Sequence, residues 1–280
     1  MRSLVCLLLV ATAASVALGE EKVPWNFLSA TWSFGGVLSR LANQAFFELP
    51  LTATRAAKEG WVQAREEAYT SLWCLPNDPR VCIRYDQQGS VAGLQVSFLA
   101  KDMAKAPFEW QKHPLVIADT IFDQDVGAGR YYFVPQEVLQ QGGRASFDEI
   151  GTGLWLQSGD DFIEVPQRES ELPALGWTKE NCIPTMGRHY YQNITSTMDC
   201  QSMEPYFLTV DVHKNWVHGV GFQLFGPKSQ ENRGWLESVP SFAVKPTLPN
   251  APQCLVDWAA DYGVLSLHVY FRKAPYLIMC

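Results

Sequence analysis

The chain has few charged residues and nothing that points to a strongly basic surface. Of its 280 residues 18% are charged, with 22 Lys or Arg against 29 Asp or Glu, so the formal net charge is −7. Hydrophobic residues make up 47%, which excludes a disordered chain, because such chains combine low hydrophobicity with high charge. The negative charge argues against nucleic acid or an anionic membrane as the main partner, since both select basic surfaces.

The local motifs of the common enzyme classes are also missing. The sequence contains no Gly-x-Ser-x-Gly elbow, no His-Glu-x-x-His helix and no glycine-rich phosphate loop followed by Lys, so no hydrolase or nucleotide-dependent class follows from it. The cysteines lack the Cys-x-x-Cys spacing of zinc sites. Residues 123–127 resemble the start of a calcium loop but lack its later ligands. No internal repeat, low-complexity segment or linker is evident.

The longest apolar run is at the N-terminus. Residues 4–18 are almost wholly apolar, follow Arg2 and end before Glu20, with small residues at Ala17 and Gly19. This pattern predicts a secretory signal peptide over residues 1–19. A membrane anchor is the alternative, but a bilayer span needs about 20 apolar residues. We therefore expect residues 20–280 to be secreted and extracellular, with no membrane span.

Removal of the signal peptide would leave an even number of cysteines. In an oxidising compartment six cysteines predict three disulfides. We expect neighbours in the sequence to pair, and the alternative for the last cysteine is a free thiol or an intermolecular bridge. The expected pairs are Cys74–Cys82, Cys182–Cys200 and Cys254–Cys280.

The sequence has one glycosylation sequon. Asn193-Ile194-Thr195 matches the acceptor pattern, which in a secreted chain predicts a surface loop carrying a glycan on Asn193. If that glycan is attached, the segment around Asn193 must be exposed.

Alternating apolar residues bounded by turn residues predict a mainly β fold. The predicted strands cover residues 90–98, 114–118, 131–134, 153–157, 162–165, 206–225 and 264–271, with hairpins over 153–165 and 206–225. Helical spacing is seen over residues 37–60, interrupted by Pro50, with a second short helix over 52–59 capped by Thr52. We expect an antiparallel sandwich or a barrel-like single domain with a short N-terminal helical element. In a two-domain alternative the seam would lie within residues 166–173.

The hairpin over residues 206–225 carries the first candidate site. If Lys214-Asn215 is a two-residue turn, Asp211 faces His218, and both share one face with His213. Such a face suits acid–base catalysis by Asp211 and His218, or a metal ion held by His213 and His218. An ordinary solvent-facing surface is the alternative, because a slip of one residue in register separates these groups. No cofactor other than this metal ion is indicated.

Two further histidines are candidate catalytic groups. His189 lies in a segment rich in polar and aromatic residues, and His268 lies in the last strand, on the face opposite Leu265 and Leu267. Either histidine suits proton transfer near neutral pH, and the alternative is that both are structural and hydrogen-bonded. With 10 Trp, 10 Tyr and 15 Phe, aromatic side chains either fill the core or line a pocket. The candidate ligand-binding residues are Arg188, Tyr190, Tyr191, Trp155 and Trp216.

Five stretches of the sequence have a characteristic spacing of residues. They are residues 50–52 with 60–61, Gly89 with 91–95, 151–155, 186–190 and 267–271. In these stretches the chain resembles a group of secreted invertebrate proteins. The resemblance covers most of the chain after the signal peptide, which implies a single domain. It also implies that His189 and His268 belong to a shared framework, whereas His213 and His218 are particular to this chain. It carries no catalytic assignment.

Two functions fit these observations. The first is a secreted, disulfide-stabilised protein that binds a small aromatic or apolar ligand in an aromatic-lined cavity. The alternative is a secreted oxidoreductase, an oxygenase of luciferase type, that acts on an aromatic small molecule through a histidine-based acid–base or metal site. The absence of a catalytic motif favours the first.

Overall fold

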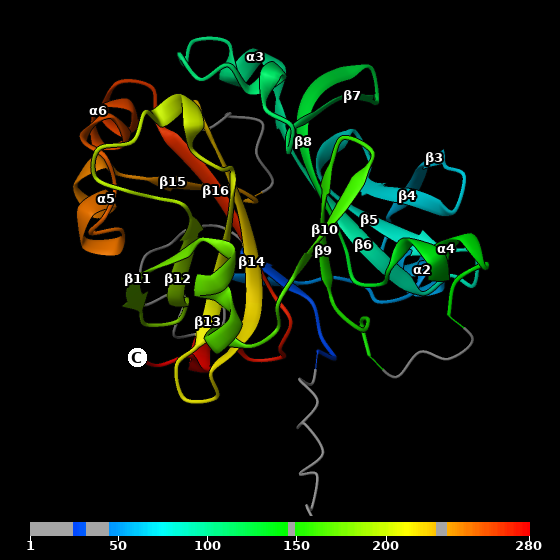
Figure 1. Ribbon diagram of the computed structural model, residues 1–280. Helices are drawn as coiled ribbons and strands as arrows, with labels where there is room; N and C mark the ends of the chain where they lie inside the picture. Colours follow the sequence, from blue (N-terminus) through cyan, green and yellow to red (C-terminus); the bar gives the residue numbers. More distant parts are fainter. Residues whose placement is uncertain (1–24, 32–44, 145–148, 228–233) are drawn as a thin grey trace, which may run out of the picture.

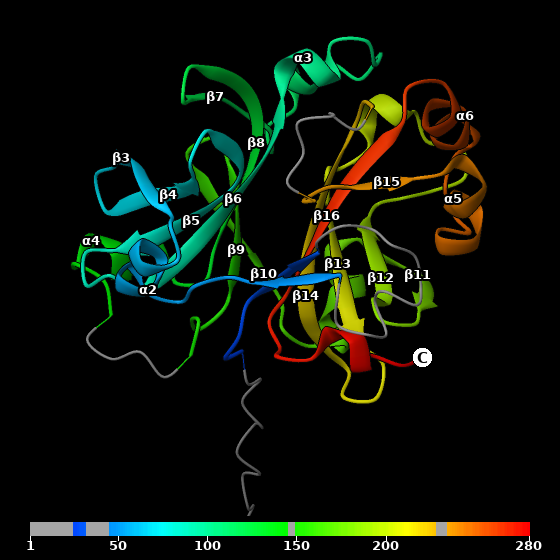
Figure 2. The same ribbon diagram turned by 180° about the vertical axis from the view of Figure 1, so that it is seen from behind.

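The computed structural model describes residues 25–31, 45–144, 149–227 and 234–280. The predicted signal peptide and residues 37–44 of the predicted N-terminal helix lie outside this part of the chain. In the described part, two antiparallel β sheets lie face to face (Figures 1 and 2). This arrangement confirms the predicted mainly β, antiparallel fold.

Each sheet has eight strands. The first follows the order β10-β9-β8-β6-β5-β4-β3, with β7 paired to β8. Its strands are β3 (Val62–Glu66), β4 (Thr70–Leu75), β5 (Asp78–Asp86), β6 (Val91–Leu99), β7 (Ile117–Ile121), β8 (Gln124–Tyr132), β9 (Leu154–Ser158) and β10 (Asp161–Val165).

In the second sheet, the two strands at one edge come from the start of the chain. Its order is β11-β12-β13-β14-β16-β1-β2, with β15 paired to β16. Its strands are β1 (Ser29–Thr31), β2 (Phe46–Glu48), β11 (Trp177–Ile183), β12 (Gly187–Gln192), β13 (Tyr206–Asp211), β14 (Trp216–Phe225), β15 (Glu237–Val239) and β16 (Val264–Tyr270).

Aromatic side chains fill the space between the two sheets. The rings of Phe98 and Phe222, one from each sheet, have centroids 5.5 Å apart, and those of Phe133 and Phe271 are 5.6 Å apart. Much of the aromatic content therefore serves the core, because large buried rings remove much apolar area from water.

The helices are short and cover the edges and outer faces. Thr52 accepts a hydrogen bond from the Arg55 backbone N–H at 3.2 Å and caps the helix predicted over 52–59. Residues 46–48 were expected to be helical but form β2, because pairing with β1 satisfies their backbone groups. None of the helices in the described residues is long and apolar enough to cross a membrane. The α-helices are α2 (Ala53–Lys58), α3 (Ala100–Met103), α4 (Gln136–Gln140), α5 (Ser241–Thr247) and α6 (Gln253–Asp261), and the 3-10 helices are η1 (Trp110–Lys112), η2 (Glu169–Leu175), η3 (Cys200–Ser202) and η4 (Pro275–Leu277).

All six cysteines of residues 20–280 form disulfides, but not all pair with their neighbours. Cys74–Cys82 joins adjacent strands as predicted. The other two predicted pairs are wrong, since the bonds are Cys182–Cys280 and Cys200–Cys254. Sequence proximity failed here because tertiary packing brings distant segments together. Cys200 in η3 meets Cys254 in α6, and the segment before Cys280 lies beside the end of β11, where the Thr185 backbone N–H donates to Ile278 O. The last residue of the chain is thus neither a free thiol nor an intermolecular bridge.

Candidate functional site

A small cavity lies on the outer face of the second sheet, beneath α5 and α6. Both helices lie on the side of this sheet that faces away from the first sheet (Figures 1 and 2). The cavity encloses about 110 Å³. Its helix side is apolar, and its sheet side carries most of its polar groups. The apolar lining includes Val239, Val244, Leu248, Leu255 and Val264, and the polar lining includes His189, Tyr191, Gln223, Glu237, Ser266 and His268.

Three ionisable side chains from three strands form a connected series at the floor of the cavity. Glu237 Oε1 lies 2.8 Å from His268 Nδ1, and His268 Nε2 lies 3.2 Å from His189 Nε2. None of the three residues is more than 4% exposed. Antiparallel pairing fixes this meeting, because Glu237 faces Ser266 on β16, two residues before His268.

The distances define where protons can lie in this series. When Glu237 is ionised it accepts and does not donate, and His268 Nδ1 then carries the proton of this hydrogen bond. At 3.2 Å one proton lies between the two Nε2 atoms, held by one imidazole and accepted by the other. The series can therefore pass a proton between the carboxylate and the imidazole of His189, which also lines the cavity.

The rest of the sheet side is rigidly held. Tyr191 donates a hydrogen bond to Gln223 Oε1 at 2.7 Å, and burial raises the pKa of Tyr191 well above its usual value. The Tyr191 ring stacks on Phe207, with centroids 5.2 Å apart. The backbone N–H of His268 donates to Thr31 Oγ1 at 3.1 Å. These contacts fix the positions of the side chains that line the cavity before any ligand binds.

The hairpin site predicted on β13 and β14 does not form. The turn spans four residues, 212–215, and not the two predicted, so Asp211 faces Trp216 and not His218. A bulge between Thr209 and Val210 then leaves His218 without a partner in the strand pairing. His213 is exposed in this turn, while His218 is 3% exposed and its Nε2 lies 3.2 Å from Met186 O. Burial, the largest cause, lowers the pKa of His218 to about 4. Asp211 accepts from the His213 backbone N–H and bonds Arg272 at 2.9 Å, which is a structural role.

The predicted metal site receives no support from the geometry. Among the described residues, no group of three or more His, Cys, Asp or Glu is placed to hold a metal ion. His213 and His218 differ sharply in exposure, because one lies in a solvent-facing turn and the other in the bulge of β14.

The predicted ligand-binding residues divide into two sets. Tyr191 lines the cavity with His189 and His268. Along β12, Arg188 and Tyr190 alternate with His189 and Tyr191 and therefore point to the other side of the strand. There they line an open groove and bond Glu169 at 3.0 Å and 2.7 Å. Trp155 belongs to the first sheet, and Trp216 lies under Lys214 at the end of β14.

Sequence reasoning missed Glu237 and the helix segment that covers the cavity. Glu237 follows a stretch without strand periodicity, and β15 is only three residues long. The alternation of residues 264–270 did indicate that such a group exists. It places Ser266 and His268 on one face of the strand, and a buried polar side chain there needs a polar partner. Nothing local indicates that Glu237 is that partner.

Comparison with known proteins adds no relative. No family model, curated protein or solved structure matches this chain. The site must therefore be interpreted from its own geometry.

Proposed function

We propose that this protein is secreted and binds a small aromatic or apolar molecule in the cavity beneath α5 and α6. The observation that carries this proposal is the cavity itself, which is apolar on one side and ends at the His189–His268–Glu237 series on the other. Pockets for small molecules combine apolar walls with a few well-placed polar groups in this way. Three disulfides fit the oxidising compartment that secretion implies.

The size of the cavity limits the ligand. An engineered apolar cavity of about 150 Å³ binds benzene. A space of about 110 Å³ therefore suits one ring or a short branched chain, carrying at most one small polar group. That group would hydrogen-bond to His189 or His268, because both imidazoles line the cavity. Phenol combines these properties and is the first probe to test.

Binding is tested with phenol, benzene and cyclohexanol by isothermal titration calorimetry on the disulfide-bonded protein. Ala243→Leu on α5 extends a side chain into the cavity and is expected to abolish binding. The matched control is Ala57→Leu, an exposed alanine on α2, which is expected to bind like the parent. Equal binding by both variants, or no binding of any probe by the parent, would remove the cavity from the function.

Catalysis on the bound molecule is the second candidate. The observation that favours it is the Glu237–His268–His189 series, which suits a general base that removes a proton from a bound phenol. This proton transfer would be the acid–base step of the secreted-oxygenase alternative, in which dioxygen is the oxidant, without the metal site predicted at His213 and His218. If the protein is an enzyme, His189→Gln and His268→Gln must each lose turnover while still binding benzene. Turnover retained in both variants would exclude these histidines from the chemistry.

A glycan on Asn193 belongs to the same secreted state. Asn193 is exposed and lies in a turn with φ of 52°, a conformation that Asn adopts more readily than most residues. Its exposure leaves room for a glycan at the sequon. Loss of mass on glycosidase treatment, absent in Asn193→Gln, tests this assignment.

A further inference from the structure

The two sheets repeat one topology. In each sheet, four consecutive strands pair with their neighbours in order, and the sixth strand pairs with the fourth. The fifth strand pairs only with the sixth, and two further strands extend the sheet beyond the sixth. Strands β3 to β10 do this in chain order. Strands β11 to β16 do the same, and β1 and β2 take the places that β9 and β10 hold in the first sheet.

The registers of the two sheets agree residue by residue. Between β6 and β8, seven pairs run from Gly93↔Tyr132 to Leu99↔Val126. Between β14 and β16, seven pairs run from Gly219↔Tyr270 to Phe225↔Val264. In both sheets the tyrosine ring covers the glycine opposite it: a Cβ on Gly93 would lie 3.1 Å from the Tyr132 ring, and one on Gly219 would lie 3.2 Å from the Tyr270 ring.

Two of the irregular features agree as well, although the shift between Cys74 and Leu75 in the β4–β5 pair has no counterpart between β12 and β13. Each sheet has a bulge in its first pair of strands and another between its third and fourth strands. In the turn after the third strand, Asp86 and Asp211 each accept backbone N–H bonds from the residues that follow and each pair with an arginine. Regular strands pair in many ways, but matching bulges and turn contacts are specific to a shared unit.

A sequence trace of this relationship remains at the start of each unit. Pro50 precedes Gly60-Trp61 at the same distance as Pro166 precedes Gly176-Trp177. Both glycines have a φ near 80°, which favours glycine, and both tryptophans are buried. The boundary between the two units thus falls at Pro166.

The units differ most where the cavity lies. In the first unit the pair Asp119↔Val126 is followed outward by a hairpin over residues 120–125, with a tight turn at Phe122 and Asp123. In the second unit the corresponding pair is Val239↔Val264, and residues 240–263 replace the hairpin with α5 and α6. The helices that cover the cavity therefore belong to a segment that is present in the second unit and absent from the first.

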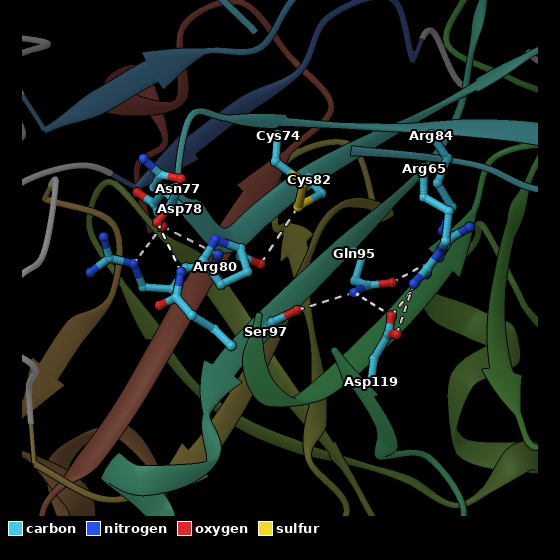
Figure 3. Close-up of a disulfide and its surroundings, with 12 residues drawn as sticks. Arg65, Cys74, Asn77, Asp78, Arg80, Cys82, Arg84, Gln95, Ser97 and Asp119 are labelled. Carbon is cyan, nitrogen blue, oxygen red and sulfur yellow. Dashed lines mark hydrogen bonds and ion pairs between the residues drawn. A yellow bond between two sulfur atoms is a disulfide. The ribbon is translucent and has the colours of Figure 1, made fainter. Parts of the chain in front are cut away.

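The floor of the cavity is filled in the first unit. Cys74 and Cys82 face each other at the positions that Tyr191 and Phe207 occupy in the second unit, and they form a disulfide (Figure 3). Arg130 stands at the position of His268 and bonds Asp119 at 2.7 Å. The first copy of the site is thus closed by a disulfide and an ion pair.

We propose that the chain consists of two copies of one eight-stranded unit, and that residues 240–263 are an insertion that makes the cavity in the second copy. The insertion determines which ligands fit, because residues 240–263 supply most of the apolar wall, namely Pro240, Ala243, Val244, Leu248 and Leu255. This statement about ligands rests on the proposed function, whereas the duplication and the insertion do not.

Two variants test the proposal without any ligand. In the first, residues 240–263 are replaced by Thr-Ile-Phe-Asp-Gln-Asp, the sequence of residues 120–125, together with Cys200→Ser. The protein is expected to be secreted with two disulfides and to unfold cooperatively in urea, and His268 is expected to react readily with diethyl pyrocarbonate. The matched control is the double variant Cys200→Ser, Cys254→Ser with α5 and α6 in place, in which His268 stays protected. Failure of the replacement to fold, with a folded control, would overturn the insertion.

The second variant, Tyr191→Cys with Phe207→Cys, tests the equivalence of the floors. If these positions match Cys74 and Cys82, whose Cα atoms are 4.4 Å apart, the new cysteines form a fourth disulfide without added oxidant. Peptide mapping without reduction would detect the bond. A folded protein that keeps both new thiols free would overturn the duplication, and if this variant is not secreted the replacement of residues 240–263 decides alone. A folded replacement that still binds phenol would contradict only the role assigned to α5 and α6.

Discussion

His189 and His268 are 79 positions apart in the sequence, yet their Nε2 atoms lie 3.2 Å apart. The meeting is a product of sheet topology, because β12 and β16 are separated by β13 and β14 and the two side chains lie on the same outer face. Phe207 occupies the position between them, with its ring centroid 5.7 Å from that of His189 and 4.8 Å from that of His268. Two buried imidazoles held in this way form one hydrogen-bonded unit with Glu237.

Removal of the carboxylate should destabilise the protein. Glu237→Ala leaves His268 Nδ1 buried without its acceptor, and an unsatisfied buried polar group costs about 1–3 kcal/mol. Glu109→Ala is the control, because Glu109 is 59% exposed and its ion pair with Lys112 contributes at most about 1 kcal/mol. Urea unfolding at pH 7 measures both free energies. Equal losses would mean that the Glu237–His268 bond adds nothing to stability.

Stability should fall between about pH 6.5 and pH 4 because of His218. Burial, the largest cause, lowers its pKa from 6.5 to about 4 in the folded protein. Below pH 6.5 the unfolded chain therefore takes up a proton that the folded chain refuses, and folding becomes less favourable as the pH drops. The full effect is about 3 kcal/mol.

The test compares His218→Gln with His213→Gln by urea unfolding at pH 7.5 and pH 4.5. The first variant should lose less stability on acidification than the parent, since Gln cannot titrate. The second should behave like the parent, because His213 is exposed. An unchanged pH dependence in His218→Gln would show that other groups cause the acid sensitivity.

The sequence predicted those features that depend on local periodicity. The alternation of residues 264–270 placed His268 opposite Leu267 correctly. The strands predicted over 90–98, 153–157 and 162–165 match β6, β9 and β10 within one residue, whereas those over 114–118 and 131–134 are displaced from β7 and β8, and β3, β4, β5, β11 and β12 were not predicted. The hairpin over residues 206–225 was found, but its register was wrong. The turn has four residues, 212–215, where two were predicted at Lys214-Asn215, so Asp211 and His218 were paired when they do not face each other. The bulge at His218 also has no local mark in the sequence.

The repeat was not predicted from the sequence because few of the matched positions hold the same residue. Equivalent positions carry Leu72 and His189, or Arg130 and His268, so side-chain chemistry obscures a shared backbone. The recoverable signal was the Pro to Gly-Trp spacing at residues 50–61 and 166–177. The wrong disulfide pairs have a related cause, since Cys182 meets Cys280 and Cys200 meets Cys254 through the packing of segments that are distant in the chain.

Disulfide mapping should find Cys182 joined to Cys280, with consequences that scale with loop length. This bond closes a loop of 98 residues, whereas Cys74–Cys82 closes a loop of 8. Chain-entropy arguments give about 4.7 kcal/mol for the long loop and about 2.5 kcal/mol for the short one. Cys182→Ser with Cys280→Ser should therefore lower the free energy of unfolding more than Cys74→Ser with Cys82→Ser. The reverse order would indicate that the Cys74–Cys82 bond is needed for packing of the first sheet.

Asp119 should stabilise the closed site of the first unit. It bonds Arg65 at 2.9 Å and Arg130 at 2.7 Å, and although burial raises its pKa, these two guanidinium groups hold that pKa well below its usual value. Asp119→Asn removes the negative charge between two arginines. Since Arg65 is 35% exposed, the loss should be about 2 kcal/mol, below the 3–5 kcal/mol typical of a fully buried pair.

Asp125→Asn is the matched control for Asp119→Asn, because Asp125 is exposed and lies in the same hairpin. Urea unfolding at pH 7 should separate the two variants, and the difference should shrink as the pH falls below about 4. Below that pH Asp119 binds a proton in the unfolded chain but stays ionised in the folded protein, which lowers the free energy of unfolding of the parent. Asp119→Asn has no such group, so its free energy of unfolding does not fall for this reason. Equal stability of the two variants at pH 7 would mean that the arginines around Asp119 are neutralised by Glu67 alone.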